Sequence, residues 1–359
     1  METLVKASEQ LISNAINLLK ALVNTPSLSG EEDQTADLIV AFLQDAGVDV
    51  DRKINNIWAF NKNYDEHKPS ILLNAHHDTV KPNAGWTYEP YKATIEDEKL
   101  IGLGSNDDGA SLVSLLAAFL FFYEQSGLKY NLIFTATAEE ETTGPNSIRC
   151  ILDEIGPFEF AIVGEPTGMQ MAIAEKGLLV LYCEAKGKSG HAARGNGINA
   201  ITEAIKDIHW FNTFKYPKIS KLLGPVQMSV TMINGGYQHN VIPDKCTFTV
   251  DIRSTDVYTN QDILDIIKQN ISSEILKASY GLNPSSAPEG HILWETAKKL
   301  NIPTFASPTL SDQAQINTPS VKIGPGLSER SHTADEFVYL SEIEEGVKGY
   351  IRLLEAIIL

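Results

Sequence analysis

The sequence is poor in features that would place it in a specialised class of protein. It has 3 cysteines in 359 residues, Cys150, Cys183 and Cys246, which lie far apart in mostly apolar surroundings. This pattern favours buried thiols in a reducing compartment over a disulfide framework. The amino terminus, METLVKASEQ, lacks a basic segment followed by an apolar run. No secretory signal is therefore expected, and a cytoplasmic location is predicted.

Long apolar runs and basic clusters are also missing. The longest apolar stretch, LLAAFLFF within residues 111–122, is well short of the roughly 20 residues that span a membrane, so it predicts a core helix. Lysine and arginine number 29 against 46 aspartates and glutamates, which gives a formal net charge of -17. Without a basic cluster to neutralise phosphates, neither nucleic acid nor an anionic membrane is expected as a partner.

The composition that remains, 43% hydrophobic and 21% charged, is that of a folded globular protein. Two domains are expected, because single cores stop growing near about 250 to 300 residues. After a helical pattern over residues 3–23, short apolar runs alternate with a long helical one: ILLNA, SLVSLLAAFLFFYEQ, YNLIFTATA and FEFAIVG. This alternation predicts an α/β domain with a mostly parallel sheet flanked by helices.

The pattern changes near residue 177. The next segments read as strands and two helices: GLLVLYCEAKG, a helix near 198–214, VQMSVTMINGG, CTFTVDIRS and a helix in DILDIIKQNISSEIL. The α/β pattern then returns with HILWETAKKL, IPTFAS, VKIG and a closing helix from Leu340. We therefore expect one domain formed by residues 1–177 and 287–359, interrupted by an inserted α+β domain of residues 178–286.

Acidic residues and histidines gather where the predicted strands end. HHD follows ILLNA, GLGSNDDGA precedes the long helix, EEE follows LIFTATA, GEPTG follows FAIV, and SHTADEF follows VKIGPG. Each cluster alone has an ordinary explanation as a surface turn, a helix cap or a solvated loop. Ligands of open α/β sheets bind beyond the carboxyl ends of the strands, so the five clusters together predict one site. Carboxylates gathered in this way need cations.

The side chains in these clusters indicate the kind of metal. Imidazole and carboxylate ligands without thiolate suit zinc and, to a lesser extent, manganese or cobalt. Two such ions can polarise an amide carbonyl and lower the pKa of water to about 7. A further carboxylate would then transfer protons. The residues point to amide hydrolysis without a covalent intermediate.

These motifs, in this order, resemble those of the di-zinc aminoacylase and carboxypeptidase-type hydrolases, most closely acetylornithine deacetylase and succinyl-diaminopimelate desuccinylase. The resemblance covers essentially the whole chain and also includes GKSGH, GGYQHNVIP and DIR. It implies a zinc-peptidase-like catalytic domain, an inserted lid or dimerisation domain, and a homodimer.

The resemblance also implies the metal ligands. Asp107 would bridge two zinc ions. His76 and Glu165 would complete one site, and Glu141 and His332 the other.

Two further residues at the strand ends have implied roles. Glu140 matches the general base that takes a proton from water and delivers it to the leaving amine. Asp78 would orient the His76 imidazole and fix its tautomer. His77 should point to the other face of an extended strand, and a structural role is expected for it.

The implied substrate contacts lie mostly in the inserted domain. His191 matches a histidine that stabilises the oxyanion in the neighbouring subunit's site. Asn240 and Arg253 match positions that can bind a substrate carboxylate, although Arg253 could equally hold the lid together. Arg330, two residues before His332, is a hypothetical contact for a substrate carboxylate, with Lys322 as the alternative.

Some positions depart from the family pattern. Gly109 stands where a lysine is usual, and AARGNG follows GKSGH where a proline is frequent. Asp108 and Glu139 lie beside ligands; a role at the helix amino terminus is expected for Asp108, and a strand-end role for Glu139.

The function favoured by these residues is that of a dimeric di-zinc amidohydrolase. It would remove an acetyl or succinyl group from a small N-acyl amino acid, with N-acetylornithine or a related arginine-biosynthesis intermediate as the leading substrate. Succinyl-diaminopimelate desuccinylase and a dipeptidase or aminopeptidase are alternatives with the same metals. An alternative of another class is a non-catalytic module that binds metal or amino acids.

Overall fold

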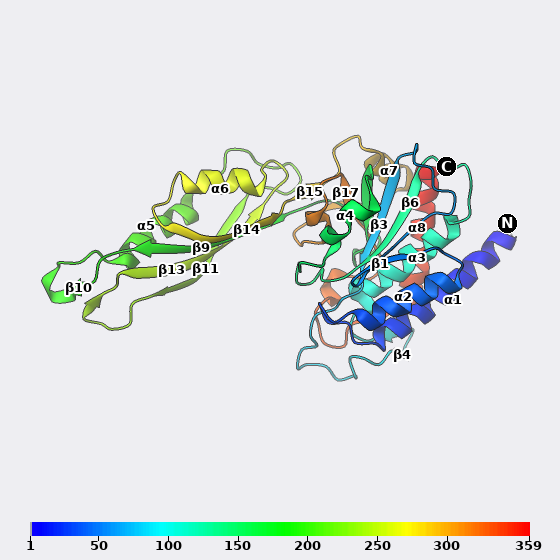
Figure 1. The fold of residues 1–359 in the computed structure, drawn as a ribbon, viewed down its shortest axis with the longest axis horizontal. Helices are drawn as coiled ribbons and strands as arrows, with labels where there is room; N and C mark the ends of the chain where they lie inside the picture. The colour runs from blue at the N-terminus through cyan, green and yellow to red at the C-terminus, as the bar shows by residue number, and fades with distance from the viewer. Residues whose placement is uncertain (1) are drawn as a thin grey trace. The chain divides into compact units, whose positions relative to one another are not determined.

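The computed structural model describes residues 2–359, which divide into two compact units drawn as ribbons in Figure 1. Unit 1 comprises residues 2–173, Ala287–Phe305 and Ser311–Leu359. Unit 2 comprises Ala174–Ser286 and Ala306–Leu310, and so interrupts unit 1 in the sequence. The role of unit 2 as a lid or dimerisation domain remains a prediction.

A twisted central sheet is the framework of unit 1. Its strands are β1 (Asp51–Lys53), β2 (Asn56–Phe60), β3 (Ser70–His76), β6 (Asn131–Thr137), β7 (Phe160–Val163), β8 (Met171–Glu175) and β17 (Ser320–Lys322). They run in the order β1-β2-β6-β3-β7-β17-β8, and β15 (Ser285–Ser286) and β16 (Thr304–Ser307) pair with β8. Strand β3 is parallel to β6 and β7, and β17 is parallel to β7. The α/β fold class with a mostly parallel sheet is therefore confirmed.

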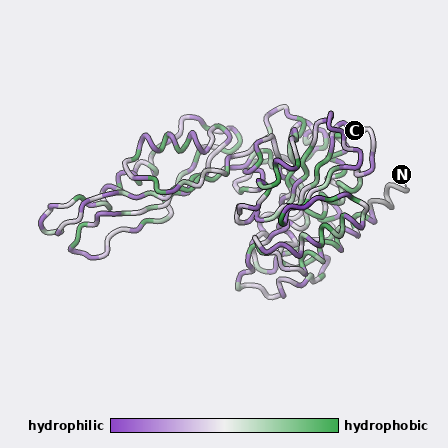
Figure 2. The backbone as a smooth tube through the Cα atoms, viewed as in Figure 1, coloured by the Kyte–Doolittle hydropathy of each residue, from purple (hydrophilic) through white to green (hydrophobic). Residues whose placement is uncertain are grey.

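Helices cover this sheet and bury its apolar residues. The helices of unit 1 are α1 (Glu2–Val23), α2 (Asp33–Asp45), α3 (Ala110–Phe122), α4 (Leu152–Ile155), α7 (Ile292–Leu300) and α8 (Leu340–Ile358). Helix α3 is mostly apolar and mostly buried, because it packs against the sheet, α1 and α8. In Figure 2 the hydrophobic colour is concentrated in the helices and central strands of this unit, and the loops are mostly hydrophilic.

The two faces of β3 have different neighbours. Ile71, Leu73 and Ala75 belong to the large core that contains α3 and α8. Leu72 points the other way, into a small apolar cluster that includes Ile316. Because side chains alternate along a strand, Asn74 and His76 share this second face.

Several short strands and helical turns lie within the loops of unit 1. A small sheet contains β4 (Thr94–Glu96), β5 (Lys99–Ile101) and β18 (Phe337–Tyr339). The short helical turns of unit 1 are η1 (Ser105–Gly109), η2 (Ile148–Cys150), η4 (Asp312–Gln315) and η5 (Ser328–Arg330).

Unit 2 is a four-stranded antiparallel sheet with helices on one face. The strands, in the order β11-β13-β9-β14, are β11 (Gln227–Gly235), β13 (Lys245–Ser254), β9 (Gly177–Lys186) and β14 (Glu274–Leu282). The remaining elements are β10 (Gly190–His191), η3 (Ala192–Arg194), α5 (Ala200–Thr213), β12 (Val241–Ile242) and α6 (Asn260–Lys268). Alternate residues of β9 and β13 are buried, including Leu181, Phe248 and Val250, in a core that α5 and α6 complete.

Two sequence expectations differ from the structure. The helix expected in DILDIIKQNISSEIL is too long, because α6 ends at Lys268 and β14 begins at Glu274. Ile275 pairs with Cys183 of β9 and packs against the core of unit 2, and this sheet pairing prevails over a helical continuation. Helix α2 was not expected. No helix in the described part of the chain combines the length and apolar character needed to cross a lipid bilayer.

Candidate metal centre

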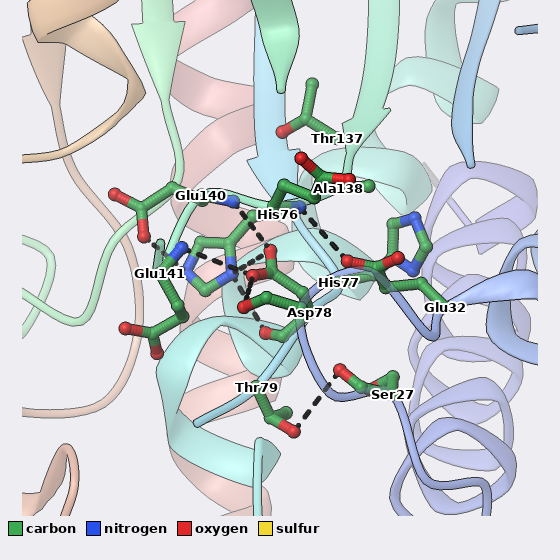
Figure 3. Close-up of polar contacts among 12 residues, drawn as sticks. Ser27, Glu32, His76, His77, Asp78, Thr79, Thr137, Ala138, Glu140 and Glu141 are labelled. Atoms are coloured by element: carbon green, nitrogen blue, oxygen red, sulfur yellow. Dashed lines mark hydrogen bonds and ion pairs between the residues drawn. The ribbon is translucent and has the colours of Figure 1, made fainter. Parts of the chain in front are cut away.

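The motif residues are brought together by strands that end at the same edge of the sheet. His76 is the last residue of β3 and pairs with Thr137, the last residue of β6. Glu139, Glu140 and Glu141 follow β6 directly, and Figure 3 shows the last two beside His76. Parallel pairing thus gathers clusters that are more than 60 residues apart in the sequence.

Asp107 lies between two histidines. Its Oδ1 atom is 3.3 Å from Nε2 of His76, and its Oδ2 atom is 3.6 Å from Nε2 of His332. Each carboxylate oxygen therefore faces a different imidazole, which is the arrangement that a bridging ligand requires. His76, Asp107 and Glu141 each offer a ligand atom, and these atoms lie within 4.8 Å of one another.

The two acids after β6 face different histidines. Oε1 of Glu141 is 3.0 Å from Nε2 of His332. Oε2 of Glu140 is 4.0 Å from Nε2 of His76. Glu141 is therefore paired with the second histidine, and the Glu140 carboxylate lies beside the first.

Glu165 follows β7 by two residues, at the same edge of the sheet. Burial raises the pKa of its carboxyl well above the usual range; Lys322 opposes this shift, and the negative charge of Asp107 adds to it. The three-residue group of His76, Asp107 and Glu141 does not include Glu165.

Asp78 connects His76 with the turn that carries Glu140 and Glu141. Its Oδ1 accepts a hydrogen bond from the backbone N–H of Glu140 (3.0 Å), and its Oδ2 accepts from that of Glu141 (3.2 Å) and from Oγ of Ser29 (2.7 Å). Oδ1 is also 3.4 Å from Nδ1 of His76. Figure 3 shows Asp78 beside His76 and the turn of Glu140 and Glu141. Asp78 thus fixes the His76 ring and the turn with Glu140 and Glu141 against each other.

His77 is held by the protein on both sides of its ring. Nδ1 is 2.9 Å from Oγ1 of Thr35, and Nε2 is 2.8 Å from the carbonyl oxygen of Asn55. Burial lowers the pKa of His77 to about 4, so the ring is neutral near pH 7. Both ring nitrogens are used within the protein, and His77 has a structural position.

The charges of the site are unbalanced in favour of carboxylates. Burial would lower the pKa of His76, but hydrogen bonds to Asp107 and Asp78 hold this pKa well above its usual value. The hydrogen bond to Glu141 raises the pKa of His332 to about 9. Burial, with the nearby acids, raises the pKa of Glu140 well above its usual range. The protein offers too little positive charge to neutralise these acids.

The donor set fits metal ions of the zinc type. Imidazole nitrogens and carboxylate oxygens converge, while Cys183 and Cys246 are buried in the core of unit 2. His332 also has a left-handed backbone, with φ of 59°. Such strained positions concentrate at functional sites.

The predicted residues of unit 2 have local partners. His191 is exposed, and its Nδ1 accepts a hydrogen bond from the backbone N–H of Ala193 (3.2 Å). Arg253 forms a two-pronged ion pair with Asp251 two residues earlier on β13, at 2.9 Å and 3.1 Å. Oδ1 of Asn240 is buried without a hydrogen-bond partner. The side chain of Arg253 is thus engaged within its own sheet, and the side-chain oxygen of Asn240 is buried.

Arg330 does not lie on a strand with His332, as its spacing in the sequence suggested. Residues Ser328–Arg330 form a 3-10 turn rather than a strand. The guanidinium forms a two-pronged ion pair with Glu342 (2.6 Å and 3.1 Å) and lies over the ring of Phe337, 4.5 Å from its centre. Both terminal nitrogens are engaged, so a substrate carboxylate would have to compete with Glu342.

One departure from the family pattern, Gly109, has a physical explanation. A Cβ atom at Gly109 would lie 2.4 Å from the carbonyl oxygen of Gly104 and 2.6 Å from Cδ1 of Leu19, so α1 packs where a side chain would otherwise begin. Asp108 lies in the turn directly before α3, although α3 begins without a side-chain cap. Burial raises the pKa of its carboxyl to about 8, and Ser111 in the first turn of α3 opposes this shift.

Glu139 is a structural acid. Its two carboxylate oxygens accept hydrogen bonds from the backbone and side-chain nitrogens of Asn146, at 2.9 Å and 2.7 Å. These bonds close the loop that begins with the acidic triplet.

Several residues that shape the site were missed in the sequence. Glu336 accepts hydrogen bonds from the backbone N–H groups of Asn106 (2.8 Å) and Asp107 (2.9 Å), and so holds the turn that carries Asp107. It lies within the motif SHTADEF, which was already connected with the site from the sequence. Ser29 and the buried Glu32, which accepts from the backbone N–H of Glu139 (3.2 Å), gave no comparable signal.

Comparison with known proteins agrees with this geometry. Residues 72–356 match the model of Peptidase family M20/M25/M40. An acetylornithine deacetylase from Proteus mirabilis is 27% identical over 364 residues, which cover 92% of this chain and 93% of that protein. A succinyl-diaminopimelate desuccinylase from Hydrogenovibrio crunogenus is 25% identical over 375 residues, covering 94% and 97%.

Solved structures agree at the level of the fold. The crystal structure of aminopeptidase PepT from Bacillus cereus matches with a TM-score of 0.76 and 19% identity, covering 96% of this chain and 98% of that one. Since the family model spans most of the chain, the resemblance to metallohydrolases drawn from the motifs is confirmed. The chain belongs to Peptidase family M20/M25/M40 and is a metallohydrolase of that family.

Proposed function

We propose that this protein is a zinc-dependent amidohydrolase that removes an acetyl or succinyl group from the nitrogen of a small amino acid. N-acetylornithine or a related intermediate of arginine biosynthesis is the leading substrate. The observation that carries the proposal is the placement of the two Asp107 oxygens against two different histidines, with Glu140 beside one of them. The acyl-amino-acid class rests on the relatives at 25% to 27% identity.

The proposed ligands are divided between two ions. His76 and Glu165 would hold one ion, Glu141 and His332 would hold the other, and Asp107 would contact both. When bound, such ions polarise an amide carbonyl and make water more acidic, so that water attacks at neutral pH. Cobalt or manganese could replace zinc in a site of this composition.

The protein's own groups would carry the protons. Glu140 would take a proton from the attacking water as the new C–O bond forms. It would then deliver this proton to the amine nitrogen as the C–N bond breaks. Asp78 would keep the turn of Glu140 in place through its two hydrogen bonds to the backbone of that turn.

Unit 2 would supply substrate contacts and a dimer surface. His191 would donate a hydrogen bond to the developing oxyanion of a neighbouring subunit, and Asn240 would bind a polar group of the substrate. The edge strand β11 supports a homodimer, because it exposes apolar side chains such as Met232 (67% exposed) and Ile233 (55%). An unpaired apolar edge of this kind favours pairing with a second chain.

The experiment that tests this function measures amine release by the zinc-loaded protein with and without a chelator. The compounds are acetyl- and succinyl-ornithine, acetyl- and succinyl-citrulline, succinyl-diaminopimelate and a dipeptide. We expect chelator-sensitive turnover of an N-acyl amino acid and none of the dipeptide.

The same panel separates the alternatives. Preferred turnover of the dipeptide would replace the proposal with a dipeptidase or aminopeptidase, which the fold also accommodates. Two bound zinc ions without turnover of any compound would favour a non-catalytic binding module.

A further inference from the structure

A short turn far from the motifs in the sequence lies against the strand ends of unit 1. This turn is η4, residues Asp312–Gln315, and both end residues are buried, with Asp312 1% and Gln315 6% exposed. Oδ2 of Asp312 accepts hydrogen bonds from Nδ2 of Asn74 (2.9 Å) and from Oγ1 of Thr137 (2.7 Å). One carboxylate oxygen therefore joins β3 and β6 close to their carboxyl ends.

The other end of the turn reaches the loop that follows β6. Oδ1 of Asp312 accepts a hydrogen bond from Nε2 of Gln315 (3.0 Å), and Oε1 of Gln315 accepts one from Oγ of Ser147 (2.7 Å). Thr137 is the last residue before the loop of residues 138–146, and Ser147 is the first residue after it. Asp312 and Gln315 thus hold both ends of the loop that carries Glu140 and Glu141.

The same contacts also reach Thr137, which pairs with His76. Asn74 and His76 share one face of β3, and Thr137 is the register partner of His76 on β6. The backbone N–H of His77 also donates to the carbonyl oxygen of Thr137 (2.9 Å). A shift of Thr137 would therefore move both the His76 end of β3 and the start of the acidic loop.

We propose that Asp312 and Gln315 are positioning residues, which fix the loop of Glu140 and Glu141 relative to His76 through Thr137, Asn74 and Ser147. Both side chains are buried, and their hydrogen bonds are to other parts of the protein. Their effect on hydrolysis rests on the proposed function, whereas their effect on the loop and on zinc affinity does not.

Asp312→Asn is the first test, because it keeps the volume and removes one acceptor. An asparagine amide has one oxygen and one NH2 group, so its nitrogen must face either the Gln315 amide nitrogen or the donors on Asn74 and Thr137. If this nitrogen faces Asn74 and Thr137, the hydrogen bond from Asn74 is lost. If it faces Gln315, the Gln315 amide must turn over, and the buried Ser147 hydroxyl loses its acceptor. We expect kcat and zinc affinity to fall by about 10-fold, the lower end of the effect of residues behind metal ligands, with little change in KM. Amide hydrogen exchange should accelerate in residues 138–147.

Combining Asp312→Asn with Gln315→Glu provides a rescue. The nitrogen at position 312 can then donate to one carboxylate oxygen at position 315, and the other oxygen can accept from Ser147. The hydrogen bonds and the total charge match those of the wild type. We expect this double variant to recover most of the kcat, the zinc affinity and the exchange protection of the loop.

Asp207→Asn is the matched control. Asp207 is also a buried aspartate (6% exposed) that accepts hydrogen bonds, from the N–H groups of Ser272 and Ser273 and from the Ser273 hydroxyl, but it lies in unit 2. Its variant should lower the melting temperature and leave zinc affinity unchanged. If Asp312→Asn does not fold, Ser147→Ala supplies the same readouts with the loss of a single hydrogen bond.

The outcomes are distinguishable from failure of the proposed function. If no N-acyl compound is turned over, loop exchange and zinc affinity, measured by competition with a chelating dye, still decide the positioning role. A folded Asp312→Asn variant with wild-type zinc affinity and loop protection would overturn the inference. So would a double variant that is no better than the single one.

Discussion

The candidate residues of unit 1 and those of unit 2 differ in how they are held. In unit 1, Asp107 and Asp78 each contact residues from separate parts of the chain, and backbone N–H groups orient their turns. In unit 2, the side chains of His191 and Arg253 form hydrogen bonds with residues two positions away in the sequence. The centre in unit 1 is therefore preorganised by contacts between distant segments, whereas the candidate residues of unit 2 are held by their immediate neighbours in the sequence.

The largest expected difference between the two units comes from Glu140. Glu140→Gln removes the proton acceptor and keeps the side chain's size, so kcat should fall by about 10²- to 10⁴-fold, the usual contribution of general acid–base catalysis. Zinc content, measured by mass spectrometry of the metal, should stay at the wild-type value because the proposed ligands are intact. Loss of zinc in this variant would make Glu140 a ligand instead.

His191 tests the corresponding role in unit 2. His191→Ala should lower kcat by about 10²- to 10³-fold if the imidazole stabilises an oxyanion. The melting temperature should be nearly unchanged, because the side chain is exposed and makes one local hydrogen bond. Mixing this variant with Glu140→Gln should restore part of the activity if the histidine acts across a dimer. Unaltered kcat in His191→Ala would rule out the role.

Arg330 tests whether a candidate substrate residue of unit 1 has a structural role instead. Arg330→Ala breaks a largely buried pair with Glu342, whose charged hydrogen bonds contribute about 1 to 3 kcal/mol, so the free energy of unfolding should decrease. Chemical denaturation measures this change. The ratio of acetyl to succinyl turnover should remain that of the wild type, since Glu342 engages the guanidinium. A changed ratio would support the hypothesis that Arg330 contacts the acyl group of the substrate.

The smallest effect concerns pH and lies outside the metal centre. His291 caps α7 by accepting the N–H of Leu293 (3.4 Å), and burial lowers the pKa of its ring. The unfolded chain has a histidine pKa of about 6.5, above that of the folded protein. Between these two pKa values the unfolded state binds more protons than the folded state. The stability contributed by the neutral ring is therefore lost as the pH falls through this window.

His291→Asn isolates this contribution, because asparagine also caps helices and does not titrate. The melting temperature of the wild type relative to the variant should therefore decrease between pH 7.5 and pH 5, by an amount on the order of 1 °C or a few degrees. A difference that is independent of pH would mean that His291 does not titrate with a lowered pKa.

The sequence was sufficient for the parts of the molecule that follow local patterns. The apolar runs of β3, β6 and β7 and the largely apolar α3 predicted the parallel sheet, and the acids after these strands predicted a common edge. The contacts that stabilise the site were not predictable in this way, because they join distant segments. Glu32, Asp312 and Gln315 are ordinary polar residues in the sequence, and only the fold places them beneath the acidic loop.

Arg330 illustrates the opposite error. Its distance of two positions from His332 suggested a shared face only under the assumption of a strand, and the chain forms a 3-10 turn there. The type of local structure decides which side chains lie together, and two residues of separation in a turn carry no such implication.

The most direct test of the central claim is anomalous diffraction at the zinc edge from crystals grown with zinc. We predict two zinc peaks in unit 1, one on each side of the Asp107 carboxylate, with His76 and Glu165 at one peak and Glu141 and His332 at the other. A single peak, or zinc bound away from Asp107, would contradict the assignment of this cluster as a two-metal hydrolytic centre.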